Sequence, residues 1–317
     1  MAAEEAGEVR PQAGVDHLWR RVARSRRVIM GGGFLFIVLL LSLTTLIVTA
    51  RPGSRWYFDD QRPDLSRRAP SISNMTEWFG TDSLGRSILS RCLMGGAASL
   101  TIGLASAALS VALGVTVGLI AGYRGGWIDS LLMRFVDILY GLPYILLVIL
   151  LKIGLERPLN AIASSPAVAN FLVLFLAIGS VSWLTMARVV RGQVLSLRAQ
   201  PFIEACRAAG LPQLRIFTHH LLPNLIGPII VYATLIVPSA ILNESFLSFL
   251  GIGIQPPVPT WGSLASDALL PALNPINSRW WMLLFPCVLL AITLLCLNFC
   301  GDGLRDVFDP HRGDAKI

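Results

Sequence analysis

The sequence predicts an all-α membrane protein that crosses the bilayer six times. Of its 317 residues, 54% are hydrophobic and 14% are charged, whereas soluble domains carry about 25% charged residues. The apolar residues gather in runs with few or no charges, each long enough to cross a hydrocarbon core of about 30 Å as a helix. The net charge of +7 comes from arginines beside these runs, which form no long basic face. This pattern favours orientation in a membrane over nucleic-acid binding.

The N-terminal part contains the first predicted span and an outer segment. Residues 1–27 are polar and end in an arginine cluster, and Val28–Ala50 carry no charge. A signal-peptide core is only about 7–15 residues long, so this longer run predicts a first transmembrane helix over 28–50. Residues 51–91 mix both charges and contain several prolines, so we expect no long helix there. We assign 1–27 to the cytoplasm and 51–91 to the outer side.

The second predicted span begins at Cys92 and is uncharged to Tyr123. Asp82 or Ser83 could cap the free N–H groups where its helix starts. Small residues recur along it at three- and four-residue spacing and predict a face that packs closely against protein. These residues are Gly103, Ala107, Ser110, Gly114, Gly118 and Gly122.

The third predicted span covers 129–153 and contains a proline. Pro143 should kink the helix. Arg134 and Asp137 form an i,i+3 pair in its first turns, and we expect them to neutralise each other.

Three further spans complete the predicted bundle. They are expected at 167–187, 225–246 and 280–301. The segment 250–279 is rich in Gly and Pro and is expected to be an exposed connection. A transmembrane core domain is thus predicted over 92–302, followed by a polar cytoplasmic tail at 303–317.

A polar and basic loop, 188–224, separates the fourth and fifth spans and is longer than a simple connection needs. Pro201 suits the first turn of a helix and predicts a short helix that ends at Ala209. Gly210 supplies its stop. A second short helix is expected from about Gln213 to Leu222, ending near Pro223. The loop is therefore predicted to be a helical hairpin between two membrane spans.

The distribution of charge orients the bundle. Six spans place both termini on the same side of the membrane. Arg and Lys are somewhat more frequent in the N-terminal segment, the central loop and the tail than in the outer segments. Acidic residues concentrate in 51–91. Both termini and the central loop are therefore predicted to be cytoplasmic.

The order of residues in the central loop resembles the EAA loop of ABC-transporter permeases. Glu204-Ala205-Cys206 precedes Gly210 by three residues, and Leu222-Pro223 closes the motif. Cys206 replaces a second alanine of the family pattern, and His220 replaces an isoleucine. The resemblance implies that this loop is a coupling helix that docks on an ATPase subunit. The residues assigned to coupling are Glu204, Ala205, Cys206, Arg207, Ala208, Ala209, Gly210, Leu222 and Pro223.

Further stretches resemble the peptide-type branch of these permeases, which serves oligopeptides, dipeptides or nickel, and in particular its oligopeptide C subunits. They are Phe79–Asp82 with Gly85-Arg86, Ala187–Gln193, Glu244–Gly251, and Gly301–Asp306 with Asp309-Pro310. Ser87 stands where the family has an acid, and Gly96-Ala97 where an arginine is usual. The resemblance implies a type I ABC importer permease fold.

The resemblance also implies a function and a set of partners. The chain would form half of the path for oligopeptides in an ATP-driven importer of a bacterial cytoplasmic (inner) membrane. Its partners would be a second homologous permease, one or two ATP-binding subunits, an extracytoplasmic substrate-binding protein, the peptide and membrane lipid, with no nucleic acid. ATP and Mg²⁺ would be bound by the ATPase subunits, with no cofactor on this chain.

The positions of the lysines agree with the expectation that ATP is bound by other subunits. The chain has only Lys152 and Lys316, and neither follows a glycine, so the GK[ST] core of a Walker A loop is absent. The chain itself is therefore predicted not to be an enzyme. GxSxG and HExxH motifs are also absent from the sequence, which disfavours a membrane lipase or protease.

Two alternatives remain open. One is a permease of the same branch for dipeptides, nickel or another small solute. The other, from a different class, is a secondary transporter without an ATPase, which predicts inverted repeats and ionisable residues at mid-span. Inverted repeats are not evident in the sequence, and charges within the spans are few.

Three polar residues near the end of the fifth span are candidates for the translocation path. Asn243, Glu244 and Ser245 could line it, or Glu244 could hold a structural place at the outer interface. The pair His219-His220 with Glu204 is a poor metal site, because adjacent side chains on a helix point about 100° apart. The five cysteines contain no CxxC pair and are interpreted as small apolar residues.

Overall fold

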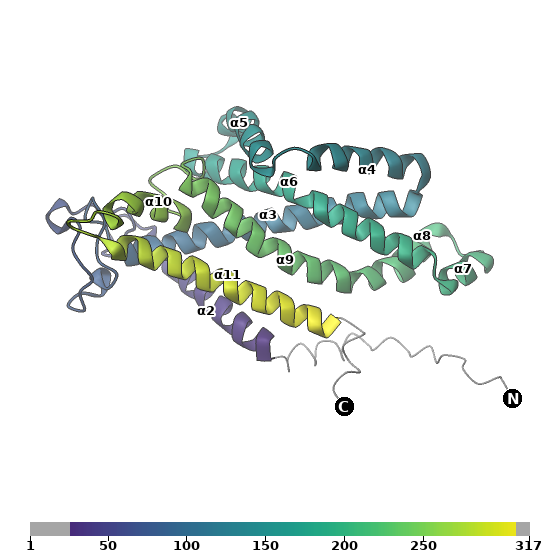
Figure 1. Ribbon diagram of the computed structural model, residues 1–317, viewed down its shortest axis with the longest axis horizontal. Helices are drawn as coiled ribbons and strands as arrows, with labels where there is room; N and C mark the ends of the chain where they lie inside the picture. Colours follow the sequence, from purple (N-terminus) through teal and green to yellow (C-terminus); the bar gives the residue numbers. More distant parts are fainter. Residues whose placement is uncertain (1–25, 309–317) are drawn as a thin grey trace.

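The computed structural model describes residues 26–308, which form an elongated bundle of helices (Figure 1). Within this range no residue belongs to a β-strand, and an isolated bridge joins Thr81 to Ser87. The segment between α2 and α3 lies at one end of the bundle, and the hairpin of α7 and α8 projects from the other (Figure 1). Residues 1–25 of the predicted N-terminal segment and 309–317 of the predicted tail lie outside the described residues.

The long helices confirm the predicted fold class. They are α2 (Arg26–Thr49), α3 (Ile88–Arg124), α6 (Pro166–Arg198), α9 (Leu222–Phe249) and α11 (Trp280–Phe308). Each of these five contains a stretch long and apolar enough to cross a membrane. A sixth span results if α4 (Gly126–Tyr140) and α5 (Tyr144–Ile162) together count as one. α6 and α11 continue beyond the ends expected at 187 and 301.

Close packing of α3 on α6 confirms the face of small residues. A Cβ added to Gly114 would lie 2.5 Å from the Cβ of Met186, and one added to Gly118 would lie 2.6 Å from the carbonyl oxygen of Ala187. The hydroxyl of Ser110 donates a hydrogen bond to the carbonyl of Gly179 at 3.1 Å. The two backbones therefore approach as closely as side chains of this size allow.

The predicted third span is broken into two helices. α4 and α5 meet at 97°, with Gly141, Leu142 and Pro143 between them. Pro143 was expected to kink a continuous helix, and the position is correct but the bend is far larger. Proline removes an N–H donor and disfavours a helical conformation of the residue before it, here Leu142. The preceding Gly141 adds backbone freedom, so the helix ends there.

Salt bridges fold the outer segment onto the start of α3. Asp82 receives hydrogen bonds from Arg86 at 2.7 Å and from Arg91 at 2.6 Å, and Arg86 also reaches Asp59 at 2.9 Å. Burial of the Arg86 guanidinium opposes its charge, but hydrogen bonds and attraction from the two carboxylates outweigh burial and raise the pKa of Arg86. Asp82 or Ser83 was expected to cap α3, but the Ser87 hydroxyl accepts the capping bond from the Ser90 N–H. The Asp82 carboxylate accepts from the N–H groups of Leu84 and Arg86, which precede the helix.

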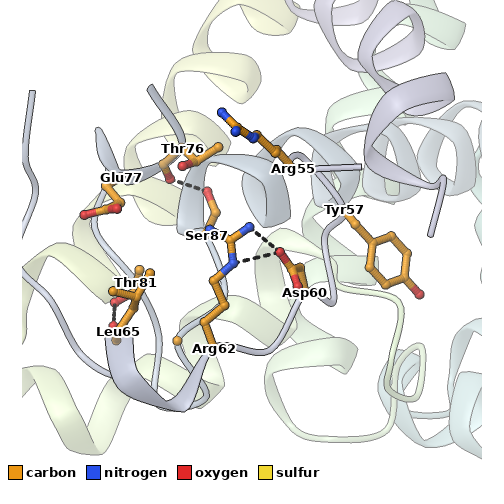
Figure 2. A pocket seen from close by; sticks show the side chains of 10 residues that line it. Arg55, Tyr57, Asp60, Arg62, Leu65, Thr76, Glu77, Thr81 and Ser87 are labelled. Atoms are coloured by element: carbon orange, nitrogen blue, oxygen red, sulfur yellow. Dashed lines mark hydrogen bonds and ion pairs between the residues drawn. The ribbon is translucent and has the colours of Figure 1, made fainter. Parts of the chain in front are cut away.

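The outer segment is a folded unit with no long helix, as predicted. It contains two short 3₁₀ turns, Pro63–Leu65 and Met75–Glu77. Figure 2 shows a small hollow in it, where Arg62 reaches back to Asp60 and the Ser87 hydroxyl donates to the carbonyl of Thr76. Gly85 closes one side at φ +75°, where an added Cβ would collide with the Arg62 carbonyl. Polar contacts within the segment therefore fix its shape.

The segment 250–279 is a packed element and not the simple exposed connection expected. It contains α10 (Trp261–Ala272), which starts with a capping box between Thr260 and Ser263. The Trp261 side chain is 2% exposed, and its indole N–H donates to the carbonyl of Cys92 at 3.0 Å. Gly and Pro content suggested a loop, but the capping pair and the buried tryptophan start a helix that packs mainly on α11 and α9.

We predict that Gly118→Ala lowers the stability of the bundle. Its methyl group would meet the α6 backbone, and overpacking of this kind costs about 1–3 kcal/mol. Gly192→Ala is the matched control, because nothing lies within 4 Å of a Cβ at that helical glycine. Thermal unfolding in detergent should give a lower Tm for Gly118→Ala and an equal or higher Tm for Gly192→Ala. Equal melting of the two variants would contradict the packing argument.

We also predict a large effect of Asp82→Ala. Removing the shared carboxylate leaves Arg86 with Asp59 alone and the buried Arg91 with only a 3.6 Å contact to Asp267, a loss of about 3–5 kcal/mol. Asp64→Ala, at an exposed residue of the same segment, should change stability by less than about 0.5 kcal/mol. The same melting experiment in detergent measures both, and a tolerated Asp82→Ala would show that the ion pairs do not hold the segment.

Candidate functional site

The hairpin at one end of the bundle begins with α7 (Pro201–Ala208). Pro201 occupies the first turn, as predicted, because its missing N–H has no partner there. Gly210 then adopts φ +71° and reverses the chain. The N–H of Gly210 donates to the carbonyl of Arg207, and the N–H of Leu211 to that of Cys206. A Cβ at Gly210 would meet nothing within 4 Å, so backbone conformation and not space demands glycine here.

The second half of the hairpin differs from the expected short helix. α8 (Gln213–Ile216) continues through a π-helical turn, Phe217–Leu221, directly into α9. The expectation that the helix ends near Pro223 is therefore wrong. Pro223 sits in the first turn of α9, where a missing N–H is tolerated. In the π turn just before it, the N–H of Leu222 bonds to the carbonyl of Phe217.

The inner side of the hairpin is fastened to the bundle. Ile203, Ile216 and Leu221 are buried together and pack against Tyr123 at the end of α3. The hydroxyl of Tyr123 donates to the carbonyl of Gln213 at 2.9 Å. These contacts join the hairpin to α3 as one packed unit.

A second fastening joins the end of α6 to the end of α3. The Arg198 guanidinium donates to the carbonyls of Gly122 and Tyr123 at 2.7 and 2.8 Å. These carbonyls lie in the last turn of α3, where a cation is favoured by the helix dipole. The hairpin follows α6 by only two residues, so its position depends on both helices.

The predicted coupling residues fall into two groups. Cys206 is half-buried, and the others on the α7 side of the hairpin are exposed. These exposed residues are Glu204, Ala205, Arg207, Ala208, Ala209 and Gly210. Leu222 and Pro223 lie at the base of α9, where Leu222 packs against a buried cluster that includes Leu225. The structure therefore places the small residues on the exposed surface of the hairpin and packs Leu222 against the bundle at the start of α9.

Ion pairs hold α4 against α6 near this end. Asp129 is paired with Arg191, and Asp137 receives a hydrogen bond from Arg188 at 2.7 Å. The predicted Arg134–Asp137 pair is therefore wrong, because the Asp137 carboxylate turns to α6. Arg188 also stacks 4.1 Å from the ring centroid of Tyr140. Sequence spacing along one helix could not reveal a partner on another helix.

The three candidate path residues point in different directions. Glu244 is 0% exposed and accepts hydrogen bonds from the hydroxyls of Ser248 at 2.7 Å and Ser245 at 3.3 Å. Ser245 is also buried, beside the backbone of Gly262 in α10. Asn243 alone faces α5, and its amide donates to the hydroxyl of Tyr144 at 3.1 Å. Glu244 is thus bonded to hydroxyls of its own helix, and Ser245 packs against α10.

The histidines of the hairpin make local contacts. His219 Nδ1 lies 2.9 Å from the Thr218 hydroxyl, and the His220 carbonyl accepts a hydrogen bond from Asn224. Within residues 26–308, groups of three or more His, Cys, Asp or Glu side chains that could hold a metal ion are not found.

The fold is that of the membrane subunit of a type I ABC importer. A chain of the MetNI methionine ABC transporter, in an inward-facing crystal form, superimposes with a TM-score of 0.55. The match covers 69% of this chain and 97% of that chain at 20% sequence identity. At this identity the likeness establishes the fold, and it confirms the fold predicted from the sequence.

Residues 114–313 match the family described as the binding-protein-dependent transport system inner membrane component, and the chain belongs to this family. The oligopeptide transport system permease protein OppC of Escherichia coli K12 is 44% identical over 86% of this chain and 85% of its own length. The dipeptide permease protein DppC of Bacillus subtilis 168 is 38% identical over 92% of this chain and 84% of its own length. The predicted peptide-type ABC permease branch is confirmed, and the chain is a multi-pass inner-membrane protein.

We predict that Arg198→Ala loosens the hairpin. The variant loses both charge-assisted hydrogen bonds to the end of α3, each worth about 1.5–3 kcal/mol. Amide hydrogen exchange in residues 200–212 should accelerate, while exchange in the middle of α9 should not change. Arg207→Ala, at an exposed residue of the hairpin itself, is the control and should leave exchange near its original rate. Unchanged protection from hydrogen exchange in Arg198→Ala would show that these two hydrogen bonds do not hold the hairpin in place.

Proposed function

We propose that this chain is the permease subunit of an ATP-driven importer of oligopeptides and forms half of the translocation path. The observation that carries the proposal is the projecting hairpin with an exposed surface of small residues, fastened beneath to α3 and α6. Small side chains let the backbone of α7 sit close to a partner protein. Oligopeptides are the proposed substrate because a relative that is 44% identical to this chain is an oligopeptide permease.

The proposed assembly distributes the work among several chains. A second, homologous permease completes the path, one or two kinds of ATP-binding subunit dock on the hairpins, and an extracytoplasmic binding protein delivers the peptide. ATP and Mg²⁺ are bound by the ATPase subunits, since this sequence contains no Walker A core. Both termini and the hairpin are cytoplasmic in this proposal, as the arginine distribution favours.

The geometry supports a direct mechanical route for coupling. When ATP binding closes the ATPase subunits, the docked α7 moves with them. The buried contacts of Ile203 and the Tyr123–Gln213 hydrogen bond carry that motion to α3, and Arg198 ties α6 to the same point. Because α3 and α6 are closely packed, they shift together and reorient the path.

A narrower alternative concerns the substrate. Relatives of similar identity include dipeptide permeases and the glutathione permease protein GsiD of Salmonella paratyphi A, which is 37% identical over 92% of this chain and 89% of its own length. Uptake of labelled dipeptides, tripeptides and longer peptides by the complete transporter separates these substrates. The secondary-transporter alternative is disfavoured by membership of a binding-protein-dependent family.

We predict that Gly210→Val uncouples transport from ATP hydrolysis. A β-branched residue at φ +71° is strained by about 1–2 kcal/mol, so the turn after α7 should change shape while the membrane helices stay intact. Peptide uptake should fall at least tenfold, and the ATPase subunits should be lost on purification in mild detergent. Glu204→Ala should weaken association less.

Gly192→Ala serves as the control for this experiment, because an added Cβ meets nothing there. It should insert, assemble and transport as the original protein does. Normal uptake together with normal ATPase association in Gly210→Val would contradict the coupling assignment. Purification of the original chain without any ATP-binding subunit, with uptake that ignores ATP, would contradict the proposed function itself.

A further inference from the structure

The break between α4 and α5 lies at membrane depth and is open to the surroundings of the chain. α4 starts beside the hairpin end of α3 and has 15 residues, so at about 1.5 Å per residue the break lies about 22 Å along the bundle. A hydrocarbon core is about 30 Å thick. Gly141, Leu142 and Pro143 are all exposed. Within the described chain, hydrogen bonds to the carbonyls of Tyr140, Gly141 and Leu142 are absent.

Free backbone groups of this kind are not tolerated against lipid tails. Irregular backbone at membrane depth occurs only where protein covers it or where it lines a water-filled cavity. The face that carries the break is therefore turned away from lipid, toward the second permease and the path between the two subunits. The path between the two subunits therefore lies on the α4–α5 side of α6.

A hollow of about 300 Å³ opens at this break. Its polar lining comes from Tyr140 of α4, Tyr144 of α5, and Ser182 and Thr185 of α6, and Asn243 of α9 lies behind Tyr144. The rest of the lining is apolar and includes Leu139, Leu142, Leu147, Val181 and Leu184. Ligand sites in proteins have this composition, with a few placed polar groups in an apolar wall.

The hydrogen bonds define which polar groups remain available. The Ser182 hydroxyl donates to the carbonyl of Ile178 at 2.9 Å, so the 3.1 Å contact with Tyr144 is donated by the Tyr144 hydroxyl. The Tyr144 oxygen in turn accepts from the amide of Asn243. Within the lining, the hydroxyls of Thr185 and Tyr140 remain as donors, and the carbonyls at the break remain as acceptors.

These groups suit an uncharged ligand with alternating donors and acceptors. Carboxylates and cationic side chains are absent from the lining of the hollow, and nearby Arg188 is already paired with Asp137. We propose that this hollow binds main-chain amide groups of the peptide in transit, with Thr185, Tyr140 and the carbonyls at the α4–α5 break as the contacts. Main-chain recognition does not depend on side-chain identity, which suits a path for peptides of varied sequence. The inference rests on the proposed function.

Thiol labelling tests whether the hollow lies in an aqueous path that peptide occupies. Thr185 is exposed, so Thr185→Cys should fold and assemble, and its labelling is measured independently of its uptake rate. We expect a sulfonated, membrane-impermeant thiol reagent to label it in the complete transporter, with labelling slowed at least threefold by saturating tri-alanine. The original protein gives the background of its native cysteines. Leu242→Cys, next to Asn243 on α9 but outside the lining, is the depth-matched control and should gain no protection from tri-alanine.

Uptake kinetics test the polar contacts themselves. Thr185→Val keeps the shape of the side chain and removes its donor, and we expect tri-alanine uptake to fall about fivefold or more. Tyr232→Phe, in a different cluster between α3 and α9, should leave uptake unchanged. If Thr185→Cys assembles into the complete transporter but is not labelled, or if Thr185→Val transports at the original rate, the inference is overturned and the proposed function stands. If the original transporter shows no ATP-dependent uptake of tri-alanine or other peptides, the proposed function fails first.

Discussion

The close approach of α3 to α6 is the constraint on which the other features depend. Gly114, Gly118 and Gly122 allow the α6 backbone to lie directly on α3. Lipid tails offer no hydrophobic drive for helix association, so contact of this kind, with hydrogen bonds such as Ser110 to Gly179, holds membrane helices together. The hairpin, the α4 ion pairs and the hollow at the α4–α5 break are all attached to this pair of helices.

Function is distributed along the bundle according to what surrounds each part. The hairpin projects where water is available, so small and polar side chains can be presented to a partner while Ile203, Ile216 and Leu221 are buried beneath. Within the apolar zone, Glu244 and Asn243 of α9 are both hydrogen-bonded to other side chains. The buried Glu244 is held by two serine hydroxyls, and Asn243 is linked through Tyr144 to Ser182. The helix break is the exception, and it lies where a path is proposed.

Local sequence patterns predicted the features that depend on a single helix. They failed for the features that depend on contacts between two helices. Charge-free runs predicted most of the membrane spans, and the spacing of small residues predicted the packed face of α3. Gly210 predicted the turn of the hairpin. Asp137 was paired wrongly, because its partner Arg188 lies 51 positions away on another helix. Asn243 and Glu244 are adjacent in sequence, but helical rotation turns one to Tyr144 and the other into the interior.

α3 is long enough to reach both ends of the bundle. Its 37 residues span about 55 Å as a single helix. At one end, Arg91 ties it to the folded segment before it through Asp82, and the Ser87 hydroxyl does so through the carbonyl of Thr76. At the other, Tyr123 holds the hairpin. A force applied to this segment is thus applied to the same helix that positions the hairpin, without crossing any interface between helices.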